Sequence, residues 1–285
     1  MTRGLVARTA LVLVLSAAPP AATEIDRPSA REVEEAIPEG DALTGRELYD
    51  RFLRNKLHTA VQYQRVVSRD PAGNEQRTRF WVRWKDYRDE NDDPGPDGVI
   101  AKTLVKFEYP FDMRNTAYLL IQRDGGTNEQ FLFRPSSGRI RRVKLRGVSV
   151  FGTDFSFEDI DFQNIEDSEY HRHPDETIDS IPVYVVEATL KPQVDSEYYK
   201  IVVYLEKQHY VPLRTRIWDE SSVEIKELIA DPSSIQEFDG AWIATRVTMH
   251  NLREGTNSTL TVERLDPNPE LADRMFGVLR LQIGH

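Results

Sequence analysis

Apolar and polar residues alternate with a period of two along most of the chain after residue 60. This alternation is typical of β-strands that bury one face and expose the other. Segments rich in Pro, Gly, Asn and Asp interrupt it at short intervals and indicate turns. The pattern predicts strands at Val61–Val67, Gln76–Tyr87, Lys102–Tyr109, Thr116–Arg123, Gln130–Arg134, Arg139–Leu145, Val183–Lys191, Tyr198–Leu205, Pro212–Asp219, Ser222–Ala230, Ala241–Asn251 and Thr256–Leu265.

Helical spacing appears before the first strand. Thr44 and Glu47 match a capping box, in which each side chain satisfies a backbone amide at the start of a helix. We therefore expect an amphipathic helix over Gly45–Lys56, and a short second helix over Ser156–Asp161. About eleven strands joined mostly by short turns, with one early helix, predict a mostly β fold: a single antiparallel sheet curled around the helix.

The first residues are typical of an export signal. Arg3 and Arg8 are basic, residues 10–15 are apolar, and small residues follow. Because the apolar run is too short to span a bilayer, a cleaved signal is favoured over an anchor. We expect a signal peptide at residues 1–22, a flexible linker at 23–42 and one domain at 43–285, which predicts a periplasmic protein.

Composition narrows the classes of partner. The formal net charge is −10, and loss of the two Arg residues of the signal takes it to −12. An acidic protein repels phosphate backbones and anionic lipid surfaces, so nucleic acid is a poor candidate. The chain contains no Cys, which excludes disulfides, thiolate metal sites and a lipid-modified cysteine.

The concave side of a curled sheet can enclose an apolar cavity. Alternation nominates the residues on that side, and the aromatic residues of the block Phe151–Asp159 are candidates for its mouth. The alternative is that the same side chains fill a solid core. The candidate ligand contacts are Phe80, Val82, Trp84, Val105, Phe107, Leu119, Ile121, Phe131, Phe133, Phe151, Phe155, Val186, Ile201, Val203, Leu213 and Ile217.

Reactive side chains do not form a recognisable catalytic pattern. Asp154, Glu158, Asp159 and Asp161 lie close together, but paired catalytic carboxylates need two different environments. We interpret these residues as solvated or helix-terminal acids. His171 and His173 lack a third ligand at metal-binding spacing, and no nucleophile elbow is present. We expect no enzymatic activity, no cofactor and no bound metal.

A basic run stands out on this acidic protein. It consists of Arg139, Arg141, Arg142 and Lys144, followed by Arg146. One interpretation is a patch that binds lipid head groups or an acidic partner surface. The other is an exposed strand whose charges deter pairing with a second sheet edge.

Several segments together resemble the outer-membrane lipoprotein-sorting family, the relatives of the periplasmic carrier LolA. The block Phe151–Asp159 is the most specific of them, and the similarity spans roughly Leu43–Leu281. The other segments, in chain order, are Asn128–Phe133, Arg139–Val143, Ile181–Ala188, Tyr199–Glu206, Tyr210–Leu213, Phe238–Trp242 and Thr245–Arg246.

The resemblance implies a half-open β-barrel, a helical lid on its open side and a hydrophobic cavity for acyl chains. It offers no catalytic residues to carry over. It implies a monomeric carrier of a lipid or an acylated lipoprotein between inner and outer membrane. An association with an inner-membrane transporter of the resistance-nodulation-division (RND) superfamily is also implied. The alternative is an accessory subunit that docks on such a transporter and carries nothing.

Overall fold

The computed structural model describes residues 42–89, 93–125, 128–145, 147–160 and 165–283. The expected signal peptide lies outside the described residues, and so does the expected linker except for its last residue. Within these residues the chain forms one large sheet, one two-stranded ribbon, one α-helix and several 3₁₀ turns.

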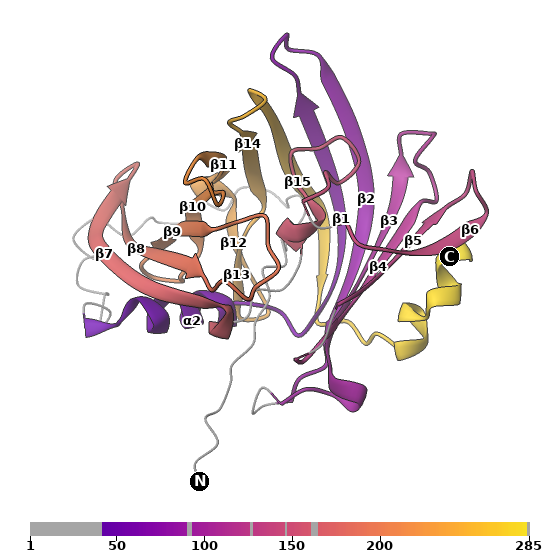
Figure 1. Ribbon diagram of the computed structural model, residues 1–285, viewed down its shortest axis with the longest axis horizontal. Helices are drawn as coiled ribbons and strands as arrows, with labels where there is room; N and C mark the ends of the chain where they lie inside the picture. The colour runs from indigo at the N-terminus through magenta and orange to yellow at the C-terminus, as the bar shows by residue number, and fades with distance from the viewer. Residues whose placement is uncertain (1–41, 90–92, 126–127, 146, 161–164, 284–285) are drawn as a thin grey trace, which may run out of the picture.

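One large sheet dominates the molecule, and all its neighbouring strands are antiparallel (Figure 1). It contains thirteen strands in the order β6-β5-β4-β3-β2-β1-β15-β14-β11-β10-β9-β8-β7. The strands are β1 (Thr59–Arg69), β2 (Glu75–Asp86), β3 (Val99–Tyr109), β4 (Ala117–Arg123), β5 (Glu129–Arg134), β6 (Arg139–Val143), β7 (Ser168–Ile178), β8 (Ile181–Leu190), β9 (Lys200–Glu206), β10 (Pro212–Trp218), β11 (Glu224–Ala230), β14 (Arg246–Asn251) and β15 (Thr256–Pro267).

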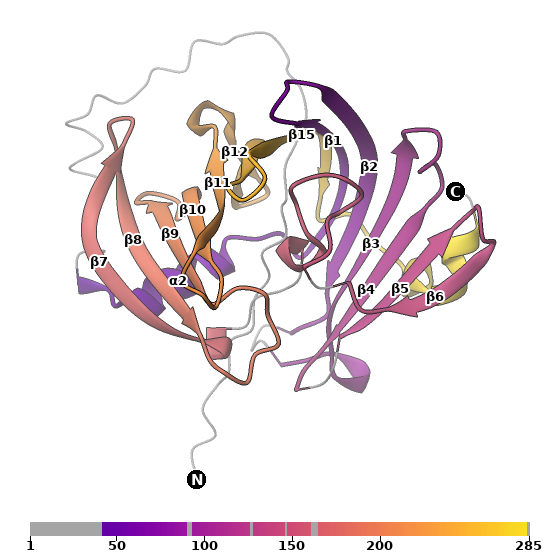
Figure 2. The ribbon, with the colours of Figure 1, turned by 45° about the horizontal axis from the view of Figure 1, so that its top comes forward.

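The sheet curls strongly but does not close, because β6 and β7 end it on opposite sides without pairing to each other (Figure 2). The predicted fold class, a single curled antiparallel sheet with an early helix, is therefore confirmed. The described chain has more strands than the eleven or so expected. A separate two-stranded ribbon, β12 (Ile235–Phe238) and β13 (Ala241–Ala244), adds to the large sheet.

Two differences from the predicted strands have clear causes. The pattern missed β7, whose side chains are mostly exposed and which includes Pro174; such a strand is tolerated because it lies at a sheet edge. The single strand expected at Ala241–Asn251 is divided at Thr245. Its first part pairs within the ribbon and its second part pairs in the large sheet.

The predicted helix is present as α2 (Gly45–Arg54), with the expected capping box between Thr44 and Glu47. Its apolar stripe packs on β7 and β8. Gly45 allows this close approach, because a Cβ atom there would lie 2.9 Å from the backbone nitrogen of Arg172. The remaining helices are short 3₁₀ turns: η2 (Pro96–Gly98), η3 (Phe157–Ile160), η4 (Ile165–Asp167), η5 (Pro232–Ser234), η6 (Asp273–Phe276) and η7 (Val278–Gln282).

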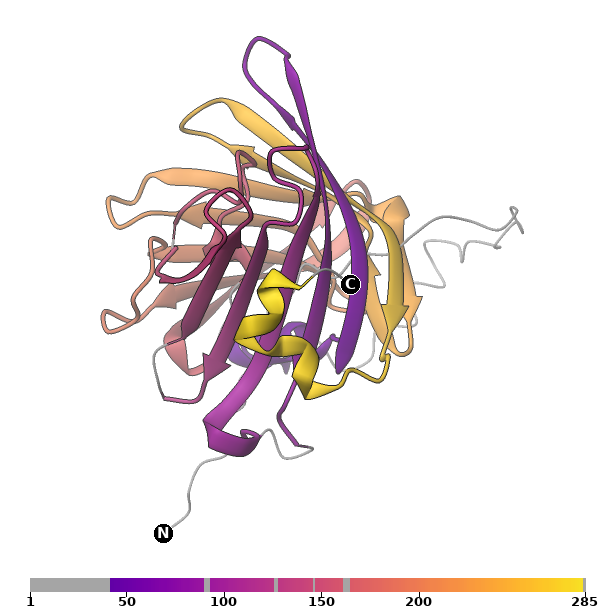
Figure 3. The ribbon, with the colours of Figure 1, turned by 90° about the vertical axis from the view of Figure 1, so that its right-hand side faces the viewer.

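The sheet buries apolar side chains on both faces. On the concave face, one cluster extends over β1–β4 and β11–β15, and a second lies between α2 and β8–β10. On the convex face, η6 and η7 lie across the strands near β6, as Figure 3 shows, and bury a third cluster. The C-terminal segment thus covers the outside of the sheet, and the concave side is left to α2 and one loop.

Candidate ligand site

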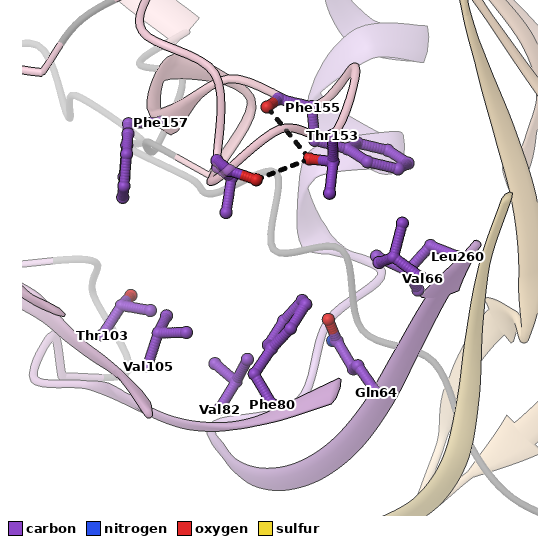
Figure 4. Close-up of a pocket in the computed structure, with 11 residues that line it drawn as sticks. Gln64, Val66, Phe80, Val82, Thr103, Val105, Thr153, Phe155, Phe157 and Leu260 are labelled. Atoms are coloured by element: carbon purple, nitrogen blue, oxygen red, sulfur yellow. Dashed lines mark hydrogen bonds between the residues drawn. The ribbon is translucent and has the colours of Figure 1, made fainter. Parts of the chain in front are cut away.

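An apolar cavity lies on the concave face between the sheet and residues 147–160, which we call the closing loop (Figure 4). The sheet forms one wall and the closing loop forms the other. The cavity has a volume of about 40 Å³. Its walls consist of Gln64, Val66, Phe80, Val82, Thr103, Val105, Val150, Thr153, Phe155, Phe157 and Leu260.

The closing loop has a defined internal structure. Ser149 and Ser156 form an isolated antiparallel bridge. Between them, Phe151 and Gly152 both have positive φ angles, a conformation that glycine adopts without strain. The Thr153 hydroxyl donates to the carbonyl of Val150 at 2.9 Å. The loop is therefore a compact turn that presents aromatic side chains to the sheet.

Aromatic contacts fill the space beneath the loop. The ring centroid of Phe151 lies 4.5 Å from that of Phe107 in an edge-on arrangement, and Phe157 lies 4.6 Å from Tyr118. Such pairs add to the burial energy of the rings. An engineered apolar cavity of about 150 Å³ holds one benzene molecule. The cavity as it stands is therefore too small for an acyl chain, because the loop occupies the hollow.

One carboxylate fastens the loop to β15. The Asp154 side chain accepts hydrogen bonds from the hydroxyls of Ser258, at 2.6 Å, and Thr256. The backbone amide of Asp154 also donates to Ser258 Oγ at 2.9 Å. These contacts are polar, and water can replace each of them if the loop lifts.

A second carboxylate fastens the other end of the loop. Asp159 Oδ2 accepts from the amide of Ser156 at 2.6 Å and from Lys226 Nζ at 2.8 Å, and Oδ1 accepts from the Tyr198 hydroxyl at 2.6 Å. Burial and the adjacent Asp159 raise the pKa of Tyr198 well above its usual value, so the hydroxyl stays a donor. Asp159 is 6 % exposed and is thus a buried anchor.

Three of the acidic residues expected to be solvated therefore have structural partners, and the fourth, Asp161, lies outside the described residues. Asp154 and Asp159 hold the loop, and Glu158 accepts hydrogen bonds from the Ser196 hydroxyl and the amide of Glu197. The sequence pattern gave no sign of these contacts, because every partner outside the loop lies far away in the sequence. These three carboxylates therefore hold the closing loop in position.

The cavity wall contains three polar residues, Gln64, Thr103 and Thr153, and the Thr153 hydroxyl is satisfied by the carbonyl of Val150. Gln64 donates to the side chain of Gln62 at 2.5 Å. The Thr103 hydroxyl is buried and has no hydrogen-bond partner among the described residues. An unsatisfied buried hydroxyl is costly, so Thr103 is the place in the wall where a polar ligand atom or a water molecule would be favourable.

Seven of the predicted ligand contacts lie in or beside the cavity. Four of them, Phe80, Val82, Val105 and Phe155, line it directly. The other three, Trp84, Phe107 and Phe151, belong to the same concave cluster. The alternation on β2 and β3 thus identified the concave face of these two strands.

Four others, Val186, Ile201, Val203 and Ile217, also lie on the concave face, but α2 covers them. They pack against the apolar stripe of the helix and do not reach the cavity. The structure places them in a filled core, which is the alternative that the sequence left open.

The remaining five do not face the concave side. Leu119, Ile121, Phe131 and Phe133 contact the C-terminal segment on the convex face, and Leu213 lies in a fourth cluster with Val183 and others. On β4 and β5, the side chains that point inward are Tyr118, Leu120 and Leu132. A shift of one residue along a strand moves every predicted side chain to the opposite face of the sheet. Because β4 is apolar on both faces, alternation could not identify its concave side.

Arg139, Arg141 and Arg142 of the basic run lie on β6, at one edge of the sheet; Lys144 follows the strand, and Arg146 lies outside the described residues. Arg142 lies 3.6 Å from Glu129 and Lys144 lies 2.7 Å from Asp195, so part of the positive charge is neutralised locally. An edge strand rich in Arg fits the interpretation that charge blocks edge pairing. Binding of head groups or a partner by this run stays a prediction.

The two histidines lie side by side on β7, with ring centroids 4.8 Å apart, and His173 Nε2 is 3.3 Å from Glu187. Among the described residues, no group of three or more His, Asp or Glu side chains is arranged to hold a metal ion. Nor do the described residues include a helix long and apolar enough to cross a membrane.

Solved structures share this half-open sheet. A putative outer membrane lipoprotein-sorting protein domain from Vibrio parahaemolyticus is 21% identical, with a TM-score of 0.74 over 84% of this chain and 98% of that one. A DUF1329 family protein from Desulfovibrio piger is 21% identical (TM-score 0.76, 83% and 97%). A LolA superfamily protein from Nitrosomonas europaea is 18% identical (TM-score 0.63, 83% and 98%). The fold is therefore LolA-like.

The sequence also places the chain in a family. A family model described as "Uncharacterized protein" matches residues 100–282, more than half of the chain, and the chain belongs to that family. No curated protein matches the sequence. The resemblance to lipoprotein-sorting proteins is thus confirmed at the level of the fold.

Proposed function

We propose that this protein is a periplasmic carrier that binds a lipid, or the acyl chains of a lipoprotein, on the concave face of its sheet and moves it between inner and outer membrane. The closing loop carries the proposal. Phe155 and Phe157 occupy an apolar hollow where an acyl chain would lie, while Asp154 and Asp159 fasten the loop through polar contacts.

Opening follows from the balance of these contacts. When the loop lifts, water replaces its hydrogen bonds at small net cost. Exposure of the apolar wall to water, in contrast, costs about 25 cal/mol per Å² of apolar surface. An acyl chain that covers the wall returns this energy. The ligand therefore shifts the loop from closed to open because it binds the open form alone.

The turns around the hollow support the proposal that the protein exchanges its ligand with a membrane. Antiparallel pairing places the turns after β1, β3, β10 and β14 at one end of the sheet. Phe111 in the second of these turns is 85% exposed, and Val223 and Leu252 in the last two are about half exposed. Exposed apolar residues at the tips of several turns favour contact with an apolar surface.

The proposal includes the organisation expected from the sequence. Residues 1–22 direct export and are removed, residues 23–42 form a linker, and residues 43–285 are a monomeric carrier domain without catalytic activity. Detection of the mature N-terminus after residue 22 in periplasmic extract checks the first part.

A reversible crosslink tests the carrier role. Because the chain contains no Cys, Asp154→Cys with Ser258→Cys introduces a single disulfide between the loop and β15. The two residues are neighbours, because Ser258 Oγ contacts both the carboxylate and the backbone amide of Asp154. The oxidised variant should not bind a fluorescent fatty acid, and reduction should restore saturable binding.

The matched control is Thr248→Cys with Thr259→Cys, which joins two paired strands whose hydroxyls are 2.9 Å apart. It introduces the same chemistry but leaves the loop free, so oxidation should not alter binding. Equal binding by the oxidised and reduced loop variants would show that the loop does not gate the site. Absence of saturable binding by the wild type, together with native mass spectra free of lipid, would refute the carrier role.

A second candidate function is an accessory subunit that docks on an RND-type transporter and carries nothing. The small volume of the cavity, about 40 Å³, favours it. In this case the charge reversals Arg141→Glu and Arg142→Glu on the edge strand should weaken co-purification with the transporter and leave the unfolding midpoint unchanged. Retention of lipid by the wild type would argue against this alternative.

A further inference from the structure

A second and larger cleft lies beside the apolar cavity. It has a volume of about 660 Å³ and lies between the closing loop, the turn after β1 and the turn after β14. Thr153 borders both spaces. An apolar space and a polar space thus meet at one residue of the loop, and this arrangement matches the two parts of an amphiphile.

The cleft carries net negative charge. Among the described residues in its wall are four carboxylates and two cationic side chains, a formal charge of −2. The carboxylates belong to Asp70, Glu75, Asp154 and Glu254, and the cations to Arg69 and Lys226.

Both cations already have anionic partners. Arg69 Nη2 lies 2.7 Å from Glu75, and Lys226 Nζ lies 2.8 Å from the buried Asp159. Neither is therefore free to bind a phosphate. The carboxylate of Glu254, in contrast, is exposed and makes no hydrogen bond or ion pair within the described chain. The cleft offers acceptors and repels anions.

We infer that this cleft binds the headgroup of the amphiphile whose tail enters the cavity, and that this headgroup has no net negative charge and presents hydrogen-bond donors. The inference rests on the proposed function and adds the chemical class of the ligand. Hydroxyl or ammonium groups are such donors, and both would pair with the carboxylates without a repulsive contact.

Three amphiphiles with one myristoyl chain test the headgroup separately from the tail. They are a monoacylglycerol, which is a neutral polyol, a lysophosphatidylethanolamine, which is zwitterionic and carries an ammonium donor, and a lysophosphatidylglycerol, which is anionic. Binding is measured by displacement of a fluorescent fatty acid at low ionic strength. The anionic ligand should bind about tenfold more weakly than the neutral one, and added salt should reduce this difference.

Charge reversal in the cleft should remove the discrimination. Glu254→Lys takes the formal charge of the cleft wall to zero, and the anionic ligand should then bind within about threefold of the neutral one. Glu108→Lys changes the total charge equally, but Glu108 is an exposed residue outside the cleft wall. This control should keep the wild-type ranking.

The outcomes separate the two proposals. If none of the three ligands binds, the carrier function fails and this inference fails with it. If all three bind with equal affinity, or the anionic one binds most tightly, the tail site stands and the headgroup site is refuted. Equal effects of Glu254→Lys and Glu108→Lys would also refute it, because total charge would then explain the ranking.

Discussion

The two halves of the concave face are covered in different ways. Over β8–β10, α2 buries Leu48, Tyr49 and Leu53 almost completely against apolar side chains of the sheet. Over β1–β3, the closing loop leaves an apolar cavity, and Asp154 and Asp159 fasten it by polar contacts.

The difference indicates which half can open. Lifting α2 would expose several fully buried side chains, each worth about 1.5–3 kcal/mol, with nothing to replace their contacts. Lifting the loop breaks charge-assisted hydrogen bonds, each worth about 1.5–3 kcal/mol, and exposes Phe155 and Phe157. Water can replace these hydrogen bonds, however, and an acyl chain can cover the apolar wall. This comparison favours the closing loop, rather than α2, as the part that opens.

The largest expected effect is on the helix side. Leu48→Ala removes a side chain that is 0% exposed and should lower the free energy of unfolding by about 3 kcal/mol, because it leaves a cavity in a filled core. Urea denaturation measures this loss. Arg54→Ala, which removes an exposed ion pair on the same helix, should cost less than about 0.5 kcal/mol. Similar midpoints for the two variants would contradict a filled core beneath α2.

The second largest expected effect distinguishes the role of the closing loop from that of α2. Asp159→Asn weakens the charge-assisted hydrogen bond from Lys226 and should cost about 2 kcal/mol. Its particular signature is faster hydrogen exchange in residues 147–160 and tighter binding of a fluorescent fatty acid, because the closed form is weakened. Leu48→Ala should change neither. Unchanged exchange in the loop would show that Asp159 does not hold it closed.

The smallest effect lies in the cavity wall. Thr103→Val replaces a buried hydroxyl without a partner by a methyl group, and should raise the free energy of unfolding by about 1 kcal/mol. Thr153→Val, in the same cavity, removes a hydroxyl that donates to Val150 and should lower it. Thermal unfolding of both proteins without ligand measures the two signs. Destabilisation by Thr103→Val would mean that its hydroxyl is satisfied.

The sequence predicted the regular parts of the sheet better than the site. β2 was placed on the correct side because polar residues such as Arg79, Arg83 and Lys85 mark its convex face, although Trp81 is buried there. β4 was not, since Tyr118, Leu119 and Leu120 are all fully buried and alternation disappears. The block Phe151–Asp159 was singled out by its composition. Its anchors on β15 and β11 lie outside it in the chain, and no local pattern reveals them.

The pairing of β1 with β15 has a consequence for folding. Ala60 lies opposite Pro267, near the middle of the sheet, so the first and last strands of the domain complete its centre together. Contacts between residues so distant in sequence raise the contact order and slow folding. The interior of the domain is therefore complete only after its last strand has joined the sheet beside its first.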